Sequence, residues 1–379
     1  AATALALSLA AAAPAAAQSP ATAQTDASLA GTIACAAIEQ QDFASLAEAP
    51  TAILSARVAT GANGEEFCAV QGLVQPQIQF ELRMPTQSWN GRYFQTGCGG
   101  LCGNVPIEAC ADMQAAGFAV AAQNMGHVGH FWRDSLWASV PQLREDFGRR
   151  STHVVAIAAK AIIARFYGAR AAYSYFRGCS TGGREGLMEA QHYPEDFDGV
   201  LAGDPAFPGR LGAIANNWEA NHLLDESDAP IFSEARLRVL ADAVTQACDG
   251  RDGLRDGIID DPRACRFNPS AIACAGAERD DCLNPAQVRA AAALYAGARN
   301  SAGVALTPGG APYGSELEWN GPNRRSIAEA WLRYLAFDGA RPNFRYRDFN
   351  FDTDVALTED ASRQYDPVPP RSVRVTSAA

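Results

Sequence analysis

The sequence of 379 residues lacks several features that would point to particular classes of protein. It has no run of lysine or arginine, and its net charge is -11 with a pI near 5.0. A chain of this charge has little attraction for nucleic-acid phosphates or anionic membranes. No stretch beyond the first residues is apolar for long enough to span a bilayer, and no internal repeat is visible. We therefore expect neither nucleic acid nor a membrane as its partner.

The N-terminus lacks an initiator Met and a basic segment, yet its composition is typical of a secretory signal. Residues 4–10 (ALALSLA) are apolar and lead into an Ala/Pro run, with small residues suited to cleavage before Gln18 or Gln24. We expect residues 1–24 to be an incomplete signal peptide and the protein to be secreted or periplasmic. A disordered alanine-rich leader is the alternative interpretation.

Ten cysteines in an acidic, exported chain indicate an oxidising compartment. Short separations favour three disulfides. The sequence leaves the pairing of the other four cysteines open. The favoured pairs are Cys35–Cys68, Cys248–Cys265 and Cys274–Cys282; the others are Cys98, Cys102, Cys110 and Cys179.

Strand-like and helix-like segments alternate in the first half of the chain. Residues 77–84 alternate polar and apolar, which predicts a strand with one solvated face. Residues 92–95, 118–122, 173–176 and 199–203 predict further strands, and 153–167 predicts a helix buried on most faces. This alternation predicts a parallel α/β sheet.

The character of the sequence changes after about Pro208. The alternation ends, and Asn, Asp, Arg and Trp become frequent between short predicted helices such as 234–246 and 285–296. We expect 25–207 to be the N-terminal part of an α/β core and 208–360 to be an inserted, mostly irregular lid domain. Residues 361–379 form an atypical tail.

The stretch Arg177–Gly186 (RGCSTGGREG) lies between a predicted strand and a predicted helix. Its Gly178–Gly182 segment matches G-x-S-x-G, which in this context indicates a nucleophile elbow with Ser180 at its centre. The turn strains the backbone of the serine and leaves no room for side chains on the flanking glycines. A glycine-rich turn without chemistry is the alternative.

A serine nucleophile needs donors for the oxyanion that forms during acyl transfer. One donor in such an elbow is the backbone N–H of the following residue, here Thr181. The glycine loop 97–103 (GCGGLCG) is a candidate source of the second, and we select Gly100. A tight turn braced by a cysteine is the alternative for this loop.

A suitable general base is missing from the sequence around this serine. In this fold the acid and then the histidine follow the serine along the chain. Of five histidines only His192 and His222 follow Ser180. His192 is predicted on the far side of the elbow helix, and His222 precedes any further core strand. Neither is a good general base.

The stretch 248–260 (CDGRDGLRDGIID) contains closely spaced aspartates and glycines. Carboxylates at Asp249, Asp252 and Asp256 are suitable ligands for Ca²⁺, and a Cys248–Cys265 bridge would close the loop. The spacing is not that of an EF-hand. A solvated acidic turn is an equal alternative from the spacing alone.

With these motifs in place, the chain resembles the tannase and feruloyl esterase family of α/β-hydrolases from about Cys35 to about Asp360. The most specific stretches are 178–184 (GCSTGGR) and 195–199 (EDFDG), and 249–260 and 351–354 add to them. The resemblance implies an α/β-hydrolase core with a lid and hydrolysis of aryl esters such as galloyl and hydroxycinnamoyl esters. It also implies Ser180 as nucleophile and a disulfide from Cys179 to a cysteine that follows the catalytic histidine.

The resemblance further implies structural calcium in the lid, bound by the three aspartates together with the carbonyls of Leu254 and Ile258. The chain departs from the family because it contains no His-Cys pair and no return to the core after the lid. We therefore expect the last core strands and the triad Asp and His to be absent, and the chain to be an inactive fragment of a secreted esterase. The alternative is a non-enzymatic, calcium-stabilised secreted binding protein derived from such an esterase.

Overall fold

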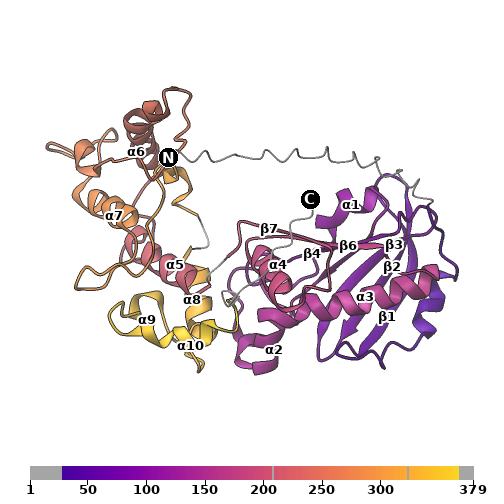
Figure 1. The fold of residues 1–379 in the computed structure, drawn as a ribbon. Helices are drawn as coiled ribbons and strands as arrows, with labels where there is room; N and C mark the ends of the chain where they lie inside the picture. The colour runs from indigo at the N-terminus through magenta and orange to yellow at the C-terminus, as the bar shows by residue number, and fades with distance from the viewer. Residues whose placement is uncertain (1–27, 207–208, 322–323, 367–379) are drawn as a thin grey trace, which may run out of the picture.

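The computed structural model describes residues 28–206, 209–321 and 324–366. The expected signal peptide, 1–24, lies outside these ranges, as does most of the expected tail. A seven-stranded mixed sheet forms the first part of the molecule, and a set of helices forms the second (Figure 1). None of the described helices is both long and apolar enough to cross a bilayer.

The sheet has the strand order β1-β2-β3-β5-β4-β6-β7. The first three strands and β5 pair antiparallel, whereas β5, β4, β6 and β7 are parallel. The expected parallel sheet is present in β5, β4, β6 and β7, and the antiparallel pairing of β1, β2 and β3 extends it. The strands are β1 (Thr51–Thr60), β2 (Glu66–Val74), β3 (Ile78–Pro85), β4 (Arg92–Thr96), β5 (Ala119–Gln123), β6 (Tyr173–Cys179) and β7 (Gly199–Gly203).

The side chains of β3 alternate between buried and solvated positions as its sequence predicts. The side chains of β4 and β5 pack alternately into two cores, one on each face of the sheet, because successive side chains of a strand point to opposite faces. Tyr93 and Ala121 pack with the apolar side of α3 (Ser151–Tyr167). Phe94 and Val120 pack with the 3₁₀ helix Ile107–Cys110 on the other face.

Helix α4 (Thr181–His192) packs against β6 and β7, beside α3. This places the carboxyl ends of the parallel strands and the start of α4 on the side that faces the helical part (Figure 1). The shorter helices of the sheet part are α1 (Ala111–Ala115) and α2 (Pro141–Glu145), which runs through a π-helical turn (Asp146–Arg150) into α3.

The helical part follows β7 and contains no strand among its described residues. Its helices are α5 (Gly209–Leu223), α6 (Glu234–Cys248), α7 (Pro285–Ala296), α8 (Arg324–Tyr334), α9 (Asp354–Leu357) and α10 (Glu359–Ser362). Helices α6 and α7 lie where the sequence predicts them. They share an apolar core with Trp319, while α5 and α8 pack together in a second core.

Arg144 of α2 connects the two parts. Its buried guanidinium donates hydrogen bonds to the hydroxyl of Tyr365 and to the carbonyls of Leu335 and Phe337. Tyr365 is itself fully buried against Phe147 and Trp331. These contacts hold the end of α8 and the last described residues against the sheet part.

The three expected disulfides, Cys35–Cys68, Cys248–Cys265 and Cys274–Cys282, are all present. The structure adds Cys98–Cys102 within the glycine loop. Cys110 and Cys179 are free among the described residues, the first buried and the second exposed.

Candidate active site

Ser180 occupies the turn between β6 and α4 with φ 58° and ψ -118°. A non-glycine residue with positive φ is strained and persists only where the surroundings hold it. The end of β7 supplies that restraint here. The N–H of Ser180 donates to the carbonyl of Gly203 at 3.1 Å, and its carbonyl accepts from Ala206 at 2.9 Å. The strained turn expected at this serine is present.

The glycines around the serine permit backbone contacts that a side chain would prevent. A Cβ on Gly178 would lie 2.2 Å from the carbonyl oxygen of Gly182, and one on Gly183 would lie 2.3 Å from that of Gly203. A Cβ on Gly97 would lie 2.7 Å from the Cα of Gly182. The glycine loop and the elbow helix therefore touch backbone to backbone.

The structure brings Thr181 and Gly100 together beside Ser180. The hydroxyl of Thr181 donates to the carbonyl of Gly100 at 2.7 Å, and all three residues line one cavity. Within the described residues, the backbone N–H groups of Thr181 and Gly100 have no acceptor. The Cys98–Cys102 disulfide braces this loop. The two interpretations of the loop, a braced turn and a source of donors, are thus compatible.

Glu185, one turn into α4, fastens the glycine loop to the helix. Its buried carboxylate accepts from the N–H of Cys98 at 2.8 Å, the hydroxyl of Thr152 at 2.6 Å and the amide of Gln123 at 2.7 Å. Burial raises the pKa of Glu185 to about 7 in spite of these donors. No role for Glu185 was predicted from the sequence, although it follows the motif directly.

The cavity at Ser180 has a volume of about 420 Å³ and lies between the two parts of the molecule. The sheet part contributes Trp132 and Arg184, whose guanidinium is held by the carbonyls of Phe147 and Gly148. Helices α5 and α8 contribute small and apolar side chains and Trp331. The cavity role of Trp132 and Arg184 was not predicted: Arg184 belongs to the specific stretch 178–184 but received no role, and no local pattern relates Trp132 to a cavity.

The aromatic residues of the helical part have separate roles. Trp331 lines the cavity, whereas Trp319 is buried in the core around α6 and α7. Trp218 packs on His222 and Phe351 in the core around α5 and α8. Only one of these three tryptophans can therefore contact a molecule in the cavity.

No histidine, aspartate or glutamate of the described residues lines this cavity. His127 is buried between the glycine loop and Trp137, and burial lowers its pKa to about 4. His222 bonds to the carbonyl of Trp218, and His192 contacts Tyr193 at the far end of α4. Neither of the two histidines that follow Ser180 along the chain therefore lies in the cavity lining.

The acidic loop 249–258 is closed by the Cys248–Cys265 disulfide. One oxygen of each aspartate accepts backbone N–H groups within the loop. The second oxygens, and the carbonyls of Leu254 and Ile258, receive no hydrogen bond from a described residue. The donors are all hard oxygens, which suits Ca²⁺. The carboxylate oxygens of Asp249, Asp252 and Asp256 do not, however, all lie within 4.8 Å of one another.

The structure is a mixed α/β fold with a cavity at Ser180, and comparison with known proteins gives the family. Residues 60–369 match the model described as tannase and feruloyl esterase. The chain therefore belongs to the tannase and feruloyl esterase family.

Two curated relatives illustrate the similarity. Mono(2-hydroxyethyl) terephthalate hydrolase of Piscinibacter sakaiensis is 37% identical over 65% of this chain and 48% of its own length. Probable feruloyl esterase B-2 of Aspergillus flavus is 32% identical over 76% of this chain and 54% of its own length. The chain spans about half the length of the curated relatives it matches.

The crystal structure of feruloyl esterase B from Aspergillus oryzae superposes with a TM-score of 0.76 and 26% identity. The match covers 88% of this chain and 71% of that structure. Tannin acyl hydrolase from Aspergillus niger shares the fold with a TM-score of 0.63 and 18% identity, over 84% of this chain and 64% of that structure.

Proposed function

We propose that this protein is a secreted serine carboxylic ester hydrolase that cleaves esters of aromatic acids. One observation carries the proposal. Ser180 is held in a strained turn at a cavity that Thr181 and Gly100 also line, and the backbone N–H groups of these two residues have no acceptor among the described residues. Four disulfides in the described residues agree with export to an oxidising compartment.

In the proposed reaction, the hydroxyl oxygen of Ser180 attacks the carbonyl carbon of the ester and loses its proton to a base. The carbonyl electrons move to the oxygen, and Thr181 and Gly100 donate their N–H groups to it. Collapse of the tetrahedral intermediate expels the alcohol and leaves the acyl group on Ser180. Attack of water on this acyl-enzyme releases the acid.

The base is the component that the cavity lining lacks. A serine hydroxyl without a base is a weak nucleophile, so the 379 residues alone are expected to turn over slowly or not at all. The same observation favours a second candidate, a binding protein that uses the cavity without chemistry. The two candidates differ in turnover, not in what the cavity accepts.

The substrate proposal depends on the aromatic side chains at the cavity and on the relatives. Trp132 and Trp331 present flat apolar surfaces against which an aromatic acid can stack. The names of two relatives denote hydrolysis of feruloyl and terephthalate esters, both derived from aromatic acids. We therefore expect hydroxycinnamoyl, galloyl or similar aryl esters.

Calcium is proposed as a structural ion of the lid. Asp249, Asp252 and Asp256 would hold it together with the carbonyls of Leu254 and Ile258. A bound ion would connect the turns of this loop by its charge, and it would take no part in the chemistry at Ser180.

The test is hydrolysis of methyl ferulate, methyl gallate and mono(2-hydroxyethyl) terephthalate by the purified full-length protein. Ser180→Ala should lower turnover by about 10³-fold or more, because it removes the attacking atom. Ser301→Ala, at an exposed serine remote from the cavity lining, should leave turnover unchanged.

Full activity in the Ser180→Ala protein would overturn the mechanism. A folded wild-type protein that binds ferulate, as followed by quenching of tryptophan fluorescence, but hydrolyses none of the three esters would support the binding protein instead.

A further inference from the structure

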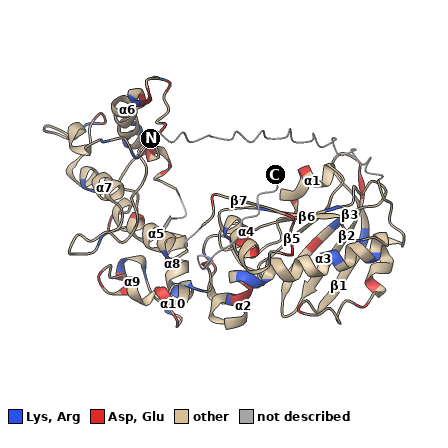
Figure 2. Ribbon diagram, viewed as in Figure 1, with Lys and Arg blue, Asp and Glu red and all other residues tan. Residues whose placement is uncertain are grey.

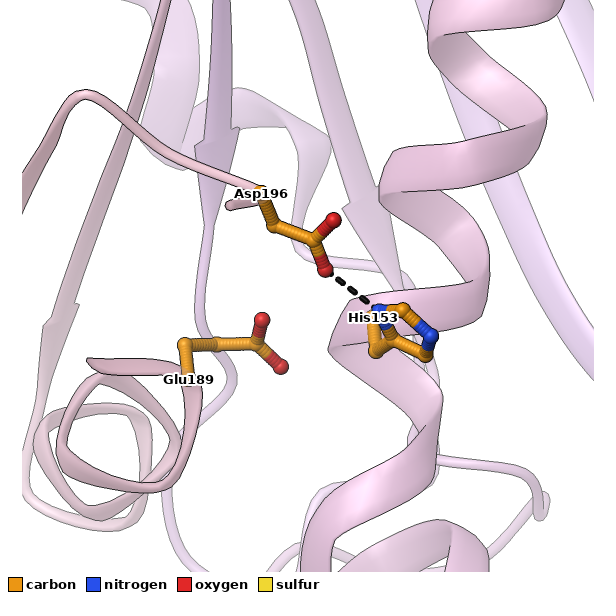
Figure 3. Close-up of side chains that lie close together, drawn as sticks. All are labelled: His153, Glu189 and Asp196. Atoms are coloured by element: carbon orange, nitrogen blue, oxygen red, sulfur yellow. Dashed lines mark hydrogen bonds and ion pairs between the residues drawn. The ribbon is translucent and has the colours of Figure 1, made fainter. Parts of the chain in front are cut away.

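A cluster of potential metal ligands lies away from the cavity, where α3, α4 and the turn before β7 meet. His153 comes from α3, Glu189 from α4 and Asp196 from the turn, and Figure 3 shows the three side chains converging. One ligand atom from each lies within 4.8 Å of the other two. No other trio of His, Cys, Asp or Glu in the described residues meets this criterion.

Glu189 lies in this cluster with one carboxyl oxygen that meets no hydrogen-bond donor of the described residues, and burial beside Asp196 raises the pKa of its carboxyl group to about 10. The residue is 1% exposed, and no donor among the described residues reaches its Oε2 atom. Its carboxyl group points toward His153 and Asp196 (Figure 3). Glu185, one turn earlier on the same helix, is equally buried but receives three hydrogen bonds. A buried carboxylate oxygen without a donor is costly unless a cation or a proton compensates it.

The imidazole of His153 is already oriented as a metal ligand would be. Its Nδ1 faces the cluster, 2.5 Å from Oδ2 of Asp196, and its Nε2 lies 3.4 Å from a carboxylate oxygen of Glu48. The ring of Tyr193 stacks on it at 3.8 Å. Histidine ligands of metals commonly donate their second ring N–H to a carboxylate, which fixes the tautomer and the ring plane.

The neighbouring cation does not fill the role of a metal. Lys160, the single lysine of the sequence, donates to the backbone carbonyl of Asp196, and its ammonium lies 5.4 Å from the ring centre of Phe197. It gives no hydrogen bond to Oε2 of Glu189. The side chains of His153 and Asp196 are 13% exposed, so an ion can enter from solvent.

We propose that His153 Nδ1, Glu189 and Asp196 bind a divalent first-row transition metal, with Zn²⁺ preferred. One nitrogen and two carboxylate oxygens are ligands that Zn²⁺ accepts, and water completes the tetrahedron. Ligand atoms of such an ion lie about 3.4 Å apart, so binding lengthens the His153–Asp196 contact and draws Glu189 inward. The protons held on the ligands leave to solvent as the metal binds.

This ion would connect α3 to α4 and to the turn that leads into β7. Glu189 is nine residues after Ser180 on α4, about 13 Å along the helix axis, so the site is separate from the reaction proposed there. Its role is to stabilise the layer of helices that supports the elbow.

The test uses the purified protein, stripped with EDTA and then held in excess Ca²⁺ so that the acidic loop does not compete for zinc. Calorimetric titration with Zn²⁺ should show one site per chain and a rise in melting temperature. Glu189→Gln and His153→Gln should each weaken binding by about 100-fold, and Glu48→Gln by about 10-fold. Glu195→Gln, at an exposed acid next to Asp196, is the matched control and should bind as the wild type does.

A second measurement needs no variant. Zn²⁺ should protect His153 from modification by diethyl pyrocarbonate, read by peptide mass spectrometry, while the exposed His130 remains reactive. Absence of Zn²⁺ binding by the wild type would overturn the proposal. Unchanged binding in Glu189→Gln, or modification of His153 at the same rate with zinc present, would also overturn it.

Discussion

The sheet part and the helical part of this protein are held together by different means. Around the elbow, backbones touch directly, and carboxyl groups such as Glu185 are buried with hydrogen-bond donors. In the helical part, two disulfides close loops, and Asp228 pairs at the surface with Arg325, Arg345 and Arg347. Figure 2 shows acidic and basic residues interspersed over both parts. The turn at Ser180 depends on close backbone packing, whereas the loops around α6 and α7 are closed by disulfides and the surface near α8 carries ion pairs.

Replacement of Gly178 tests the close packing most directly. Gly178→Ala places a Cβ 2.2 Å from a backbone oxygen of Gly182, so α4 must move relative to β6. We expect a loss of more than about 3 kcal/mol in the free energy of unfolding, measured by urea denaturation, together with loss of the serine's geometry.

The matched control lies in the other part. Gly276→Ala adds a Cβ with no atom within 4 Å and should change stability by less than about 0.5 kcal/mol. Equal effects of the two substitutions would show that the contrast in packing does not hold.

Removal of the Cys248–Cys265 disulfide tests the cross-linked part. The bridge spans 17 residues, and its loss in Cys248→Ser/Cys265→Ser should cost about 3 kcal/mol by the entropy of the opened loop. Hydrogen exchange should rise in α6 and the acidic loop and stay unchanged in β4 and β6. Loss of the Cys274–Cys282 bridge, which spans 8 residues, should cost less. Faster exchange throughout the sheet would mean that the two parts unfold as one unit.

The sequence predicts those elements whose pattern is local. Residues 77–84 alternate clearly between polar and apolar side chains. Asn284 forms a capping box with Gln287 at the start of the helix over 285–296. Strand β1 was not predicted because its residues Leu54 and Val58 are exposed, so the apolar residues of β1 do not mark one buried face. Its partner β2 was not predicted either. The antiparallel pairing of β1 with β2, and of β2 with β3, was therefore not predicted.

In the candidate site, too, the residues with a local sequence pattern could be predicted and the others could not. The elbow residues and the glycine loop could be predicted because a strained turn and a close approach require glycine at fixed spacing. Trp132 and Glu189 could not be predicted, because their roles arise from segments that the fold brings together. No spacing in the sequence relates His153 to Glu189.

The pH dependence of stability should distinguish the two parts by its sign. The carboxyl group of Glu185 has a pKa of about 7 in the folded protein and 4.5 when exposed, so between these values the folded state holds the extra proton. Its contribution therefore makes the free energy of unfolding fall, by on the order of 2 kcal/mol, as pH rises from 4.5 to 7. Glu185→Gln should remove this fall, and Glu195→Gln should not.

Asp228 should act in the opposite direction. The hydroxyl of Tyr346 and the surrounding arginines lower the pKa of Asp228 below its ordinary value of 3.8. Its unfolded form takes up a proton first as pH falls, so its stabilising contribution is present above pH 3.8 and is lost below it. Urea denaturation of Asp228→Asn, Glu185→Gln and the wild type from pH 3 to pH 8 measures the contribution of each carboxyl group to the free energy of unfolding. The same sign in both would mean that the buried carboxyl of the sheet part is ionised like the paired one at the surface, and that its three donors outweigh its burial.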